Sequence, residues 1–143
     1  MFLVAAVLLT IPMNANSATG AFEVKLAAQP PDEKSAPLLG RMRIDKQFHG
    51  SLEATSVGQM LTAGTDVKGS AVYVAIEQVT GRLDGRAGSF VLHHTGIMTR
   101  GEPQLSVTVV PDSGTGELKG ITGSMTIKID GGKHSYAFEY KLP

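Results

Sequence analysis

Glu77 and His94 are the two residues whose types and positions best fit chemistry inside this protein. A carboxylate beside an imidazole can exchange a proton with a bound molecule, or hold its polar group through hydrogen bonds. Both groups are costly to bury in an apolar interior unless they are paired. Three interpretations follow: a structural pair that is satisfied internally or by solvent, an anchor for a ligand, and an acid–base pair of an enzyme.

The two residues are predicted to meet because a tight turn joins the segments that carry them. Asp84-Gly85 is a strong signal for a two-residue hairpin, since a type I′ turn needs a positive φ at both positions. Counting outward from this turn places Glu77 opposite Leu92, with His94 one diagonal step away. Diagonal neighbours on paired strands lie within reach of long side chains.

Six further side chains are candidates for lining a pocket. Three of them share the inward face of the strands that carry Glu77 and His94, and three aromatic residues occupy every second position of the last predicted strand. Aromatic faces are expected to point inward, where they form the core or line a pocket. Two phenol groups near the end of the chain could also lie at a pocket mouth. The candidate pocket-lining residues are Tyr73, Phe90, Leu92, Tyr136, Phe138 and Tyr140.

Several kinds of chemistry are excluded or lack support. The sequence has no cysteine, which excludes disulfides, thiolate nucleophiles, cysteine-based zinc sites and iron–sulfur clusters. His93 and His94 are adjacent, so on a strand they face opposite sides and do not easily bind one metal ion. Residues 114–116 lack the pattern of a phosphate-binding loop, and no serine lies in a nucleophile elbow. We therefore predict no metal site and no cofactor.

The charge balance argues against a nucleic-acid partner. Lysine and arginine number 13, as do aspartate and glutamate, so the formal net charge is zero. Binding to phosphates needs a basic excess. Hydrophobic residues make up 42% of the chain and charged residues 18%, which is ordinary for a folded domain and excludes disorder as its main state.

The elements that must position the candidate residues are β-strands. Apolar residues alternate with period 2, the 17 glycines suit many tight turns, and no window favours an amphipathic helix. Short links favour consecutive antiparallel pairing, and closing the sheet buries its apolar face and removes both edges. The sequence predicts an all-β, eight-stranded antiparallel up-and-down β-barrel, with a two-layer sandwich as the alternative. The predicted strands cover residues 21–26, 41–48, 51–60, 71–79, 88–97, 104–110, 123–130 and 134–142.

The first 17 residues are predicted to be a signal peptide, followed by a single barrel domain over residues 18–143. Residues 2–11 form an apolar run that is too short to span a membrane and has the length of a signal-peptide core. Ala15 and Ser17 suit a cleavage site before Ala18. We therefore expect no transmembrane segment and export to the periplasm or medium. A cytoplasmic location is the alternative, because no basic residue precedes the apolar run.

Four blocks of the sequence resemble a bacterial domain family of unknown function. These blocks are residues 73–81, 85–96, 109–118 and 134–142, and they occur in order within residues 19–143. The members of that family resemble the barrel of allene oxide cyclase, so the resemblance implies an allene oxide cyclase-like, eight-stranded antiparallel fold. The plant cyclases act on an unsaturated fatty-acid epoxide. The sequence carries no motif of their active site, and the resemblance therefore assigns no catalytic residue.

Three classes of function remain open for an uncharacterised barrel of this kind. Eight strands enclose an interior that is just wide enough for side chains or one small ligand. The leading hypothesis is a binding module that holds a small apolar molecule. The alternatives are an isomerase or cyclase that uses Glu77 and His94, and a structural or interaction barrel with a filled interior, which could form a homo-oligomer through an outer face.

Overall fold

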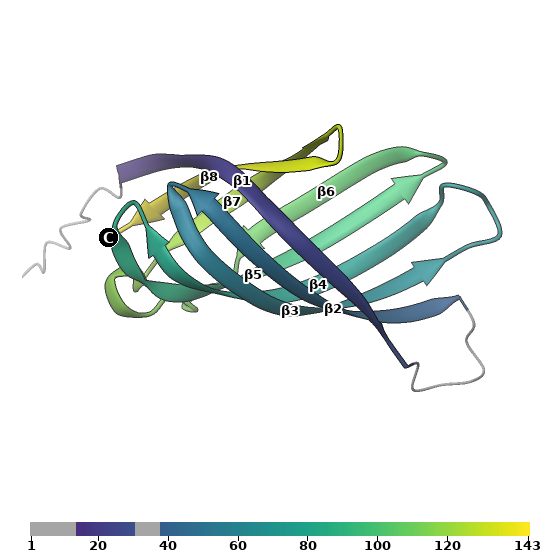
Figure 1. Ribbon diagram of the computed structural model, residues 1–143, viewed down its shortest axis with the longest axis horizontal. Helices are drawn as coiled ribbons and strands as arrows, with labels where there is room; N and C mark the ends of the chain where they lie inside the picture. The colour runs from purple at the N-terminus through teal and green to yellow at the C-terminus, as the bar shows by residue number, and fades with distance from the viewer. Residues whose placement is uncertain (1–13, 31–37) are drawn as a thin grey trace, which may run out of the picture.

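The computed structural model describes residues 14–30 and 38–143, and these residues form one closed barrel of eight antiparallel strands (Figure 1). Every strand pairs with the strands before and after it in the chain, and β1 closes the barrel against β8. The predicted all-β, up-and-down barrel is confirmed. The elements are β1 (Asn14–Gln29), β2 (Leu39–Gly50), β3 (Leu52–Gly64), β4 (Ala71–Leu83), β5 (Arg86–Thr99), β6 (Glu102–Val109), the 3₁₀ turn η1 (Gly116–Leu118), β7 (Thr122–Asp130) and β8 (Lys133–Leu142).

Alternation of side chains determines which residues form the interior. On β4, Ala75, Glu77 and Val79 are buried, whereas Ile76 and Gln78 between them are exposed. Neighbouring strands place their inward residues at the same level, so the buried positions combine into one core. This two-residue period is the feature that the sequence displays most clearly.

The turn at Asp84-Gly85 has the conformation that its sequence predicts. The φ angles are 47° at Asp84 and 82° at Gly85, and both lie in the left-handed region that a type I′ turn requires. The turn sets the register of β4 against β5, in which Glu77 lies opposite Leu92 and Ala75 lies opposite His94. The predicted register is therefore confirmed.

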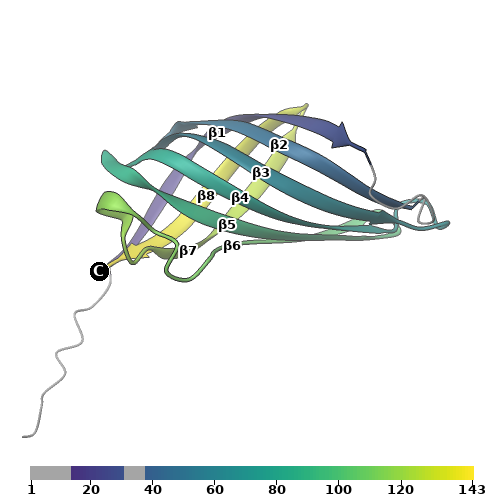
Figure 2. The same cartoon turned by 90° about the horizontal axis from the view of Figure 1, so that it is seen from below.

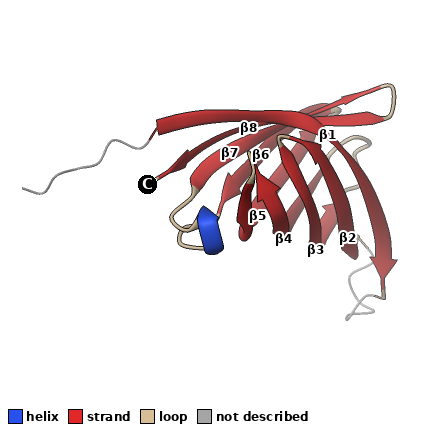
Figure 3. Ribbon diagram, turned by 60° about the vertical axis from the view of Figure 1, so that its left-hand side comes forward, coloured by secondary structure: helices blue, strands red, loops and turns tan. Residues whose placement is uncertain are grey.

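One end of the barrel is tightly packed by aromatic and aliphatic side chains. Phe90 stacks on Phe138 at 5.6 Å, and the hydroxyl of Tyr136 donates to the carbonyl of His49 at 2.9 Å. The loop between β6 and β7 covers this end with η1, which Figure 3 shows in blue near the C-terminus. Leu118 of η1 is only 1% exposed, so the loop belongs to the core.

The barrel is much less complete between β6 and β7. Within the described chain, these two strands share a single partner pair, Thr108↔Ser124, whereas the other neighbouring strands pair along most of their length. Figures 1 and 2 show β6 and β7 diverging from each other toward the β5–β6 and β7–β8 turns. The end of the barrel opposite η1 therefore has an unpaired stretch in its wall.

β1 begins at Asn14, four residues before the predicted start of the barrel domain. Residues 14–17 pair with β8, and the Ser17 hydroxyl donates to Glu139 Oε1 at 2.7 Å. The sequence concealed this stretch because residues 14–17 are polar or small and follow directly on the apolar run of the predicted signal peptide, and the next inward positions, 18 and 20, carry no large apolar side chain. Ala18 is fully buried, and a Cβ at Gly20 would lie 2.6 Å from the Tyr136 hydroxyl oxygen. Residues 1–13, which carry most of the predicted signal peptide, lie outside the described residues.

Among the described residues, no helix is long and apolar enough to cross a membrane.

Candidate functional site

Glu77 and His94 both point into the barrel and face each other across β4 and β5. Glu77 is 0% exposed and His94 is 4% exposed. The distance from Glu77 Oε1 to His94 Nε2 is 3.7 Å, which is longer than a hydrogen bond. The structure thus places the two residues as the strand register predicted, but it leaves a gap between their polar atoms.

Lys46 of β2 completes an interior cluster that we call the polar cluster: Lys46, Glu77 and His94. Its Nζ lies 2.8 Å from Glu77 Oε2, and the Lys46 residue is only 9% exposed. The ammonium group also lies 4.9 Å from the centre of the Phe22 ring and 5.6 Å from that of Phe48. Both rings favour a cation over their faces.

Lys46 is not among the candidate residues predicted from the sequence, although the sequence contains a signal for it. Lys46 has the same strand parity as Ile44 and Phe48, which are buried on either side of it. A lysine on an inward face usually has a partner of opposite charge, because an unpaired buried ammonium group is costly. This parity, read together with the inward Glu77, would have predicted the ion pair.

The electrostatics of the polar cluster keep Glu77 ionised. Burial is the largest single influence on the pKa of Glu77, and it raises that pKa. The polar contact with His94 and the positive charge of Lys46 act in the opposite direction and together outweigh it, so the pKa lies below its ordinary value. Glu77 is therefore a carboxylate at neutral pH.

Several polar atoms at this level of the barrel are buried without a hydrogen-bond partner in the described part of the chain. They are the Ser56 hydroxyl oxygen, both carboxylate oxygens of Glu77, and His94 Nε2. The contact of Glu77 Oε2 with Lys46 is an ion pair that lacks the angles of a hydrogen bond. Buried polar atoms in native proteins are nearly always satisfied, so unsatisfied ones call for a functional or solvent partner.

Two glycines allow the strands around the polar cluster to approach closely. Gly58 lies opposite Glu77, and a Cβ at this position would meet the carbonyl oxygen of Ile76 at 2.5 Å. Gly96 lies opposite Tyr73, whose ring covers it: a Cβ at Gly96 would meet Tyr73 Cε1 at 2.1 Å.

The phenol of Tyr73 is also influenced by the polar cluster. Burial is the larger cause and the charge of Glu77 the smaller cause that raise the pKa of Tyr73.

The predicted pocket-lining residues divide into two groups. Phe90, Leu92, Tyr136, Phe138 and Tyr140 are each at most 3% exposed and belong to the packed core. Tyr73 alone is half-buried and lies on the side of the polar cluster away from that core. The phenol of Tyr140 donates to the Asp84 carboxylate, and burial followed by this bond raises the pKa of Tyr140 to about 12.

The inner wall beyond the polar cluster is apolar and accessible to solvent. It contains side chains that face inward by strand parity and are nevertheless substantially exposed, at the end of the barrel where β6 and β7 are unpaired. Apolar side chains that line an accessible concave wall are typical of a ligand site. The residues and their exposed fractions are Leu26 46%, Met98 44%, Leu105 41% and Ile129 64%.

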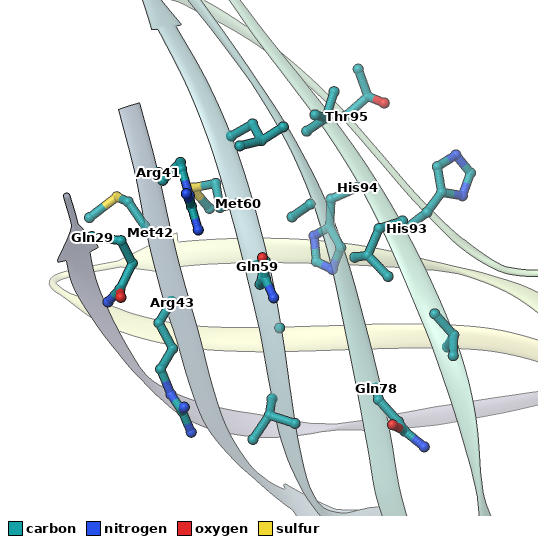
Figure 4. A pocket seen from close by; sticks show the side chains of 17 residues that line it. Gln29, Arg41, Met42, Arg43, Gln59, Met60, Gln78, His93, His94 and Thr95 are labelled. Carbon is teal, nitrogen blue, oxygen red and sulfur yellow. The ribbon is translucent and has the colours of Figure 1, made fainter. Parts of the chain in front are cut away.

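Apart from the interior, a hollow with a volume of about 800 Å³ lies mainly on the outer face of β2 to β5 (Figure 4). Its lining includes His93, which points away from His94 on the other side of β5 and whose Nδ1 lies 2.7 Å from the Thr108 hydroxyl. Neither Glu77 nor Lys46 lines this hollow. His94 does contribute to the lining of this hollow, whereas the ion pair of Lys46 and Glu77 belongs to the interior alone.

In the part of the chain that the structure describes, the geometry does not bring metal ligands together. No group of three His, Asp or Glu side chains that could hold a metal ion occurs in residues 14–30 and 38–143. The polar cluster contributes one carboxylate, one imidazole and one ammonium group, and the ammonium would repel a cation. The site offers hydrogen bonding and charge pairing to a bound molecule.

The fold and its interior define the class: a small eight-stranded β-barrel with a charged cluster inside. Residues 18–140 match the family described as protein of unknown function (DUF3224), and the chain belongs to that family. It is similar to the crystal structure of a DUF3224 protein of unknown function from Shewanella oneidensis, with 52% sequence identity and a TM-score of 0.85. The alignment covers 91% of this chain and 99% of the other. No curated protein matches the chain. The predicted membership of a bacterial family of unknown function is confirmed.

Proposed function

We propose that the barrel binds a small, largely apolar molecule in its interior, with a polar group of that molecule at the polar cluster. The observation that carries this proposal is the pair Glu77 Oε1 and His94 Nε2, buried and facing each other at 3.7 Å without hydrogen-bond partners among the described residues. A ligand atom placed between them would satisfy both. The apolar part would lie on the exposed inner wall that contains Leu26 and Leu105.

The unpaired stretch between β6 and β7 supplies a route to this interior. Beyond Thr108↔Ser124 the two strands diverge, and the inward residues beside the gap, Leu105 and Ile129, are apolar. An apolar molecule can therefore enter from the side of the barrel without unfolding the packed end.

Binding is favoured over catalysis by the state of Glu77. An efficient general base has a pKa near the working pH, whereas the pKa of Glu77 lies below that of an ordinary glutamate. The ion pair with Lys46 is one cause of this lowered pKa. An isomerase or cyclase that uses Glu77 and His94 is thus the weaker candidate.

Binding can be tested with Nile red, an uncharged apolar dye that fluoresces when it leaves water. The Leu105→Lys substitution places a charge on the inner wall and is expected to weaken dye binding at least tenfold, or about 1.4 kcal/mol. Ser106→Lys on the outer face of the same strand is the matched control and is expected to leave binding unchanged. Equal binding by both variants would contradict the proposal.

We also propose that residues 1–17 direct export and are removed. The apolar run at residues 2–11 supports this, as does the start of the family match at residue 18. Cleavage before Ala18 would remove residues 14–17, which pair with β8. N-terminal sequencing of protein recovered from outside the cytoplasm is expected to begin at Ala18, and an intact Met1 would contradict the proposal.

A further inference from the structure

We infer that the interior site selects an uncharged molecule that carries a hydroxyl group, in preference to a carboxylate or an amine of the same size. This inference rests on the proposed function and names the chemical class of its ligand. It follows from two independent features of the polar cluster: its charge balance and the separation of its unpartnered atoms.

The charges of Lys46 and Glu77 balance each other without a ligand. Lys46 and Glu77 form an ion pair at 2.8 Å, and their side chains are 6% and 0% exposed. A ligand carboxylate would add a second negative charge beside Glu77. A ligand amine would add a second positive charge beside Lys46. Either ligand would leave an uncompensated charge in the interior, which is strongly unfavourable.

The separation of the unpartnered atoms suits one oxygen atom that both donates and accepts. An oxygen can lie about 2.8 Å from both Glu77 Oε1 and His94 Nε2, because these two atoms are 3.7 Å apart. Glu77 Oε1 can only accept a hydrogen bond, whereas His94 Nε2 donates in one of its tautomers. A hydroxyl group can donate to the first and accept from the second. A ketone or ether oxygen cannot donate and would leave Glu77 unsatisfied.

Ser56 adds a further polar partner at the same level of the barrel. It lies opposite Lys46 in the pairing of β2 with β3, is 3% exposed, and has an unpartnered hydroxyl oxygen in the described structure. Its hydroxyl can either donate or accept, so it tolerates a second polar group on the ligand without adding charge.

The test compares 1-octanol, octanoate and octylamine, which share a chain length and differ in the charge of the head group. Calorimetric titration of the unchanged protein at neutral pH is expected to show octanol binding at least about tenfold more tightly than either charged compound. Octanoate or octylamine binding as tightly as octanol would overturn the inference. This comparison needs no variant, so a folding defect cannot obscure it.

Two substitutions are expected to change the preference in opposite directions. Glu77→Gln leaves the charge of Lys46 uncompensated, so the affinity for octanoate should rise relative to that for octanol. Lys46→Met leaves the charge of Glu77 uncompensated, so the affinity for octylamine should rise relative to that for octanol. His93→Leu, on the outer face next to His94, should change none of the ratios. Unchanged ratios in both interior variants would overturn the inference.

The result also separates this inference from the proposed function. Nile red binding that is sensitive to Leu105→Lys, together with no preference for octanol, overturns only the chemical class of the ligand. Failure of Nile red and of all three octyl compounds to bind overturns the proposed function and this inference together.

Discussion

Glu77 Oε1 and His94 Nε2 face each other inside the barrel at 3.7 Å, close enough to share one bridging atom and too far apart to bond directly. The Glu77 carboxylate is held by Lys46 at 2.8 Å on its other oxygen. This arrangement fixes one side of the carboxylate and leaves the other side available. This geometry is the observation on which the proposal of interior binding rests.

Lys46 and Glu77 are expected to stabilise the fold only when both are present. Lys46→Met should lower the free energy of unfolding by about 3–5 kcal/mol, because it leaves Glu77 buried and charged. Adding Glu77→Gln should recover part of this loss. Chemical denaturation of the two single variants and the double variant measures the coupling. Lys128→Met, on an exposed position of β7, is the control, and strictly additive losses would contradict the pairing.

The lowered pKa of Glu77 predicts a specific acid sensitivity. A carboxyl group whose pKa is lowered on folding adds stability above its unfolded pKa, here ordinarily 4.5, and this stability is lost as the pH falls below that value. The Glu77→Gln variant should therefore lose less stability than the unchanged protein between about pH 4.5 and the pKa of folded Glu77. Denaturation measured across this range checks the difference. If the free energies of unfolding of the two proteins changed with pH in parallel, Glu77 would not be held ionised by the fold.

The raised pKa of Tyr140 predicts the opposite sensitivity at high pH. Its phenol ionises at about 12 in the folded protein and has an ordinary value of 10.0. The stability that it adds is present below pH 10 and is lost as the pH rises toward 12. Tyr140→Phe should therefore remove part of the alkaline decline in stability. A decline of unchanged steepness in this variant would contradict the role of the Tyr140–Asp84 hydrogen bond.

The turn at Gly85 predicts a loss of stability that depends on backbone conformation alone. A Cβ at Gly85 would meet no atom within 4 Å, so Gly85→Val is strained only by its φ of 82°. We expect a loss of about 1–2 kcal/mol from this strain. Gly85→Asn, which tolerates positive φ, is the matched control and should lose less. Equal thermal stability of the valine variant and the unchanged protein would count against a strained turn.

The gap between β6 and β7 predicts that bridging these strands slows ligand entry. Ser106→Cys and Thr126→Cys continue the register of Thr108↔Ser124, and the absence of native cysteines makes a bismaleimide cross-link between them specific. Cross-linking should slow the association of Nile red. The same cross-link between Thr55→Cys and Thr80→Cys, which are already paired, should not. Equal association rates would show that the ligand enters elsewhere.

The sequence predicted the fold and two of the three residues of the polar cluster for a clear physical reason. Side-chain alternation and the Asp84-Gly85 turn are local signals, and together they determine the relation of Glu77 to His94. Lys46 was missed because β2 comes near Glu77 only through β3. The start of β1 at Asn14 was missed because residues 14–17 are polar or small, show no apolar alternation, and are held by pairing with the distant β8. The gap after Thr108 depends on how β6 and β7 diverge, which residue alternation does not record.

The most direct test of interior binding is a crystal structure of the protein grown with 1-octanol. We predict the hydroxyl oxygen between Glu77 Oε1 and His94 Nε2, within hydrogen-bond distance of both, and the alkyl chain along the inner wall beside Leu105. Octanol bound only in the outer hollow beside His93, or Glu77 and His94 bonded directly to each other in an interior without octanol, would contradict the account.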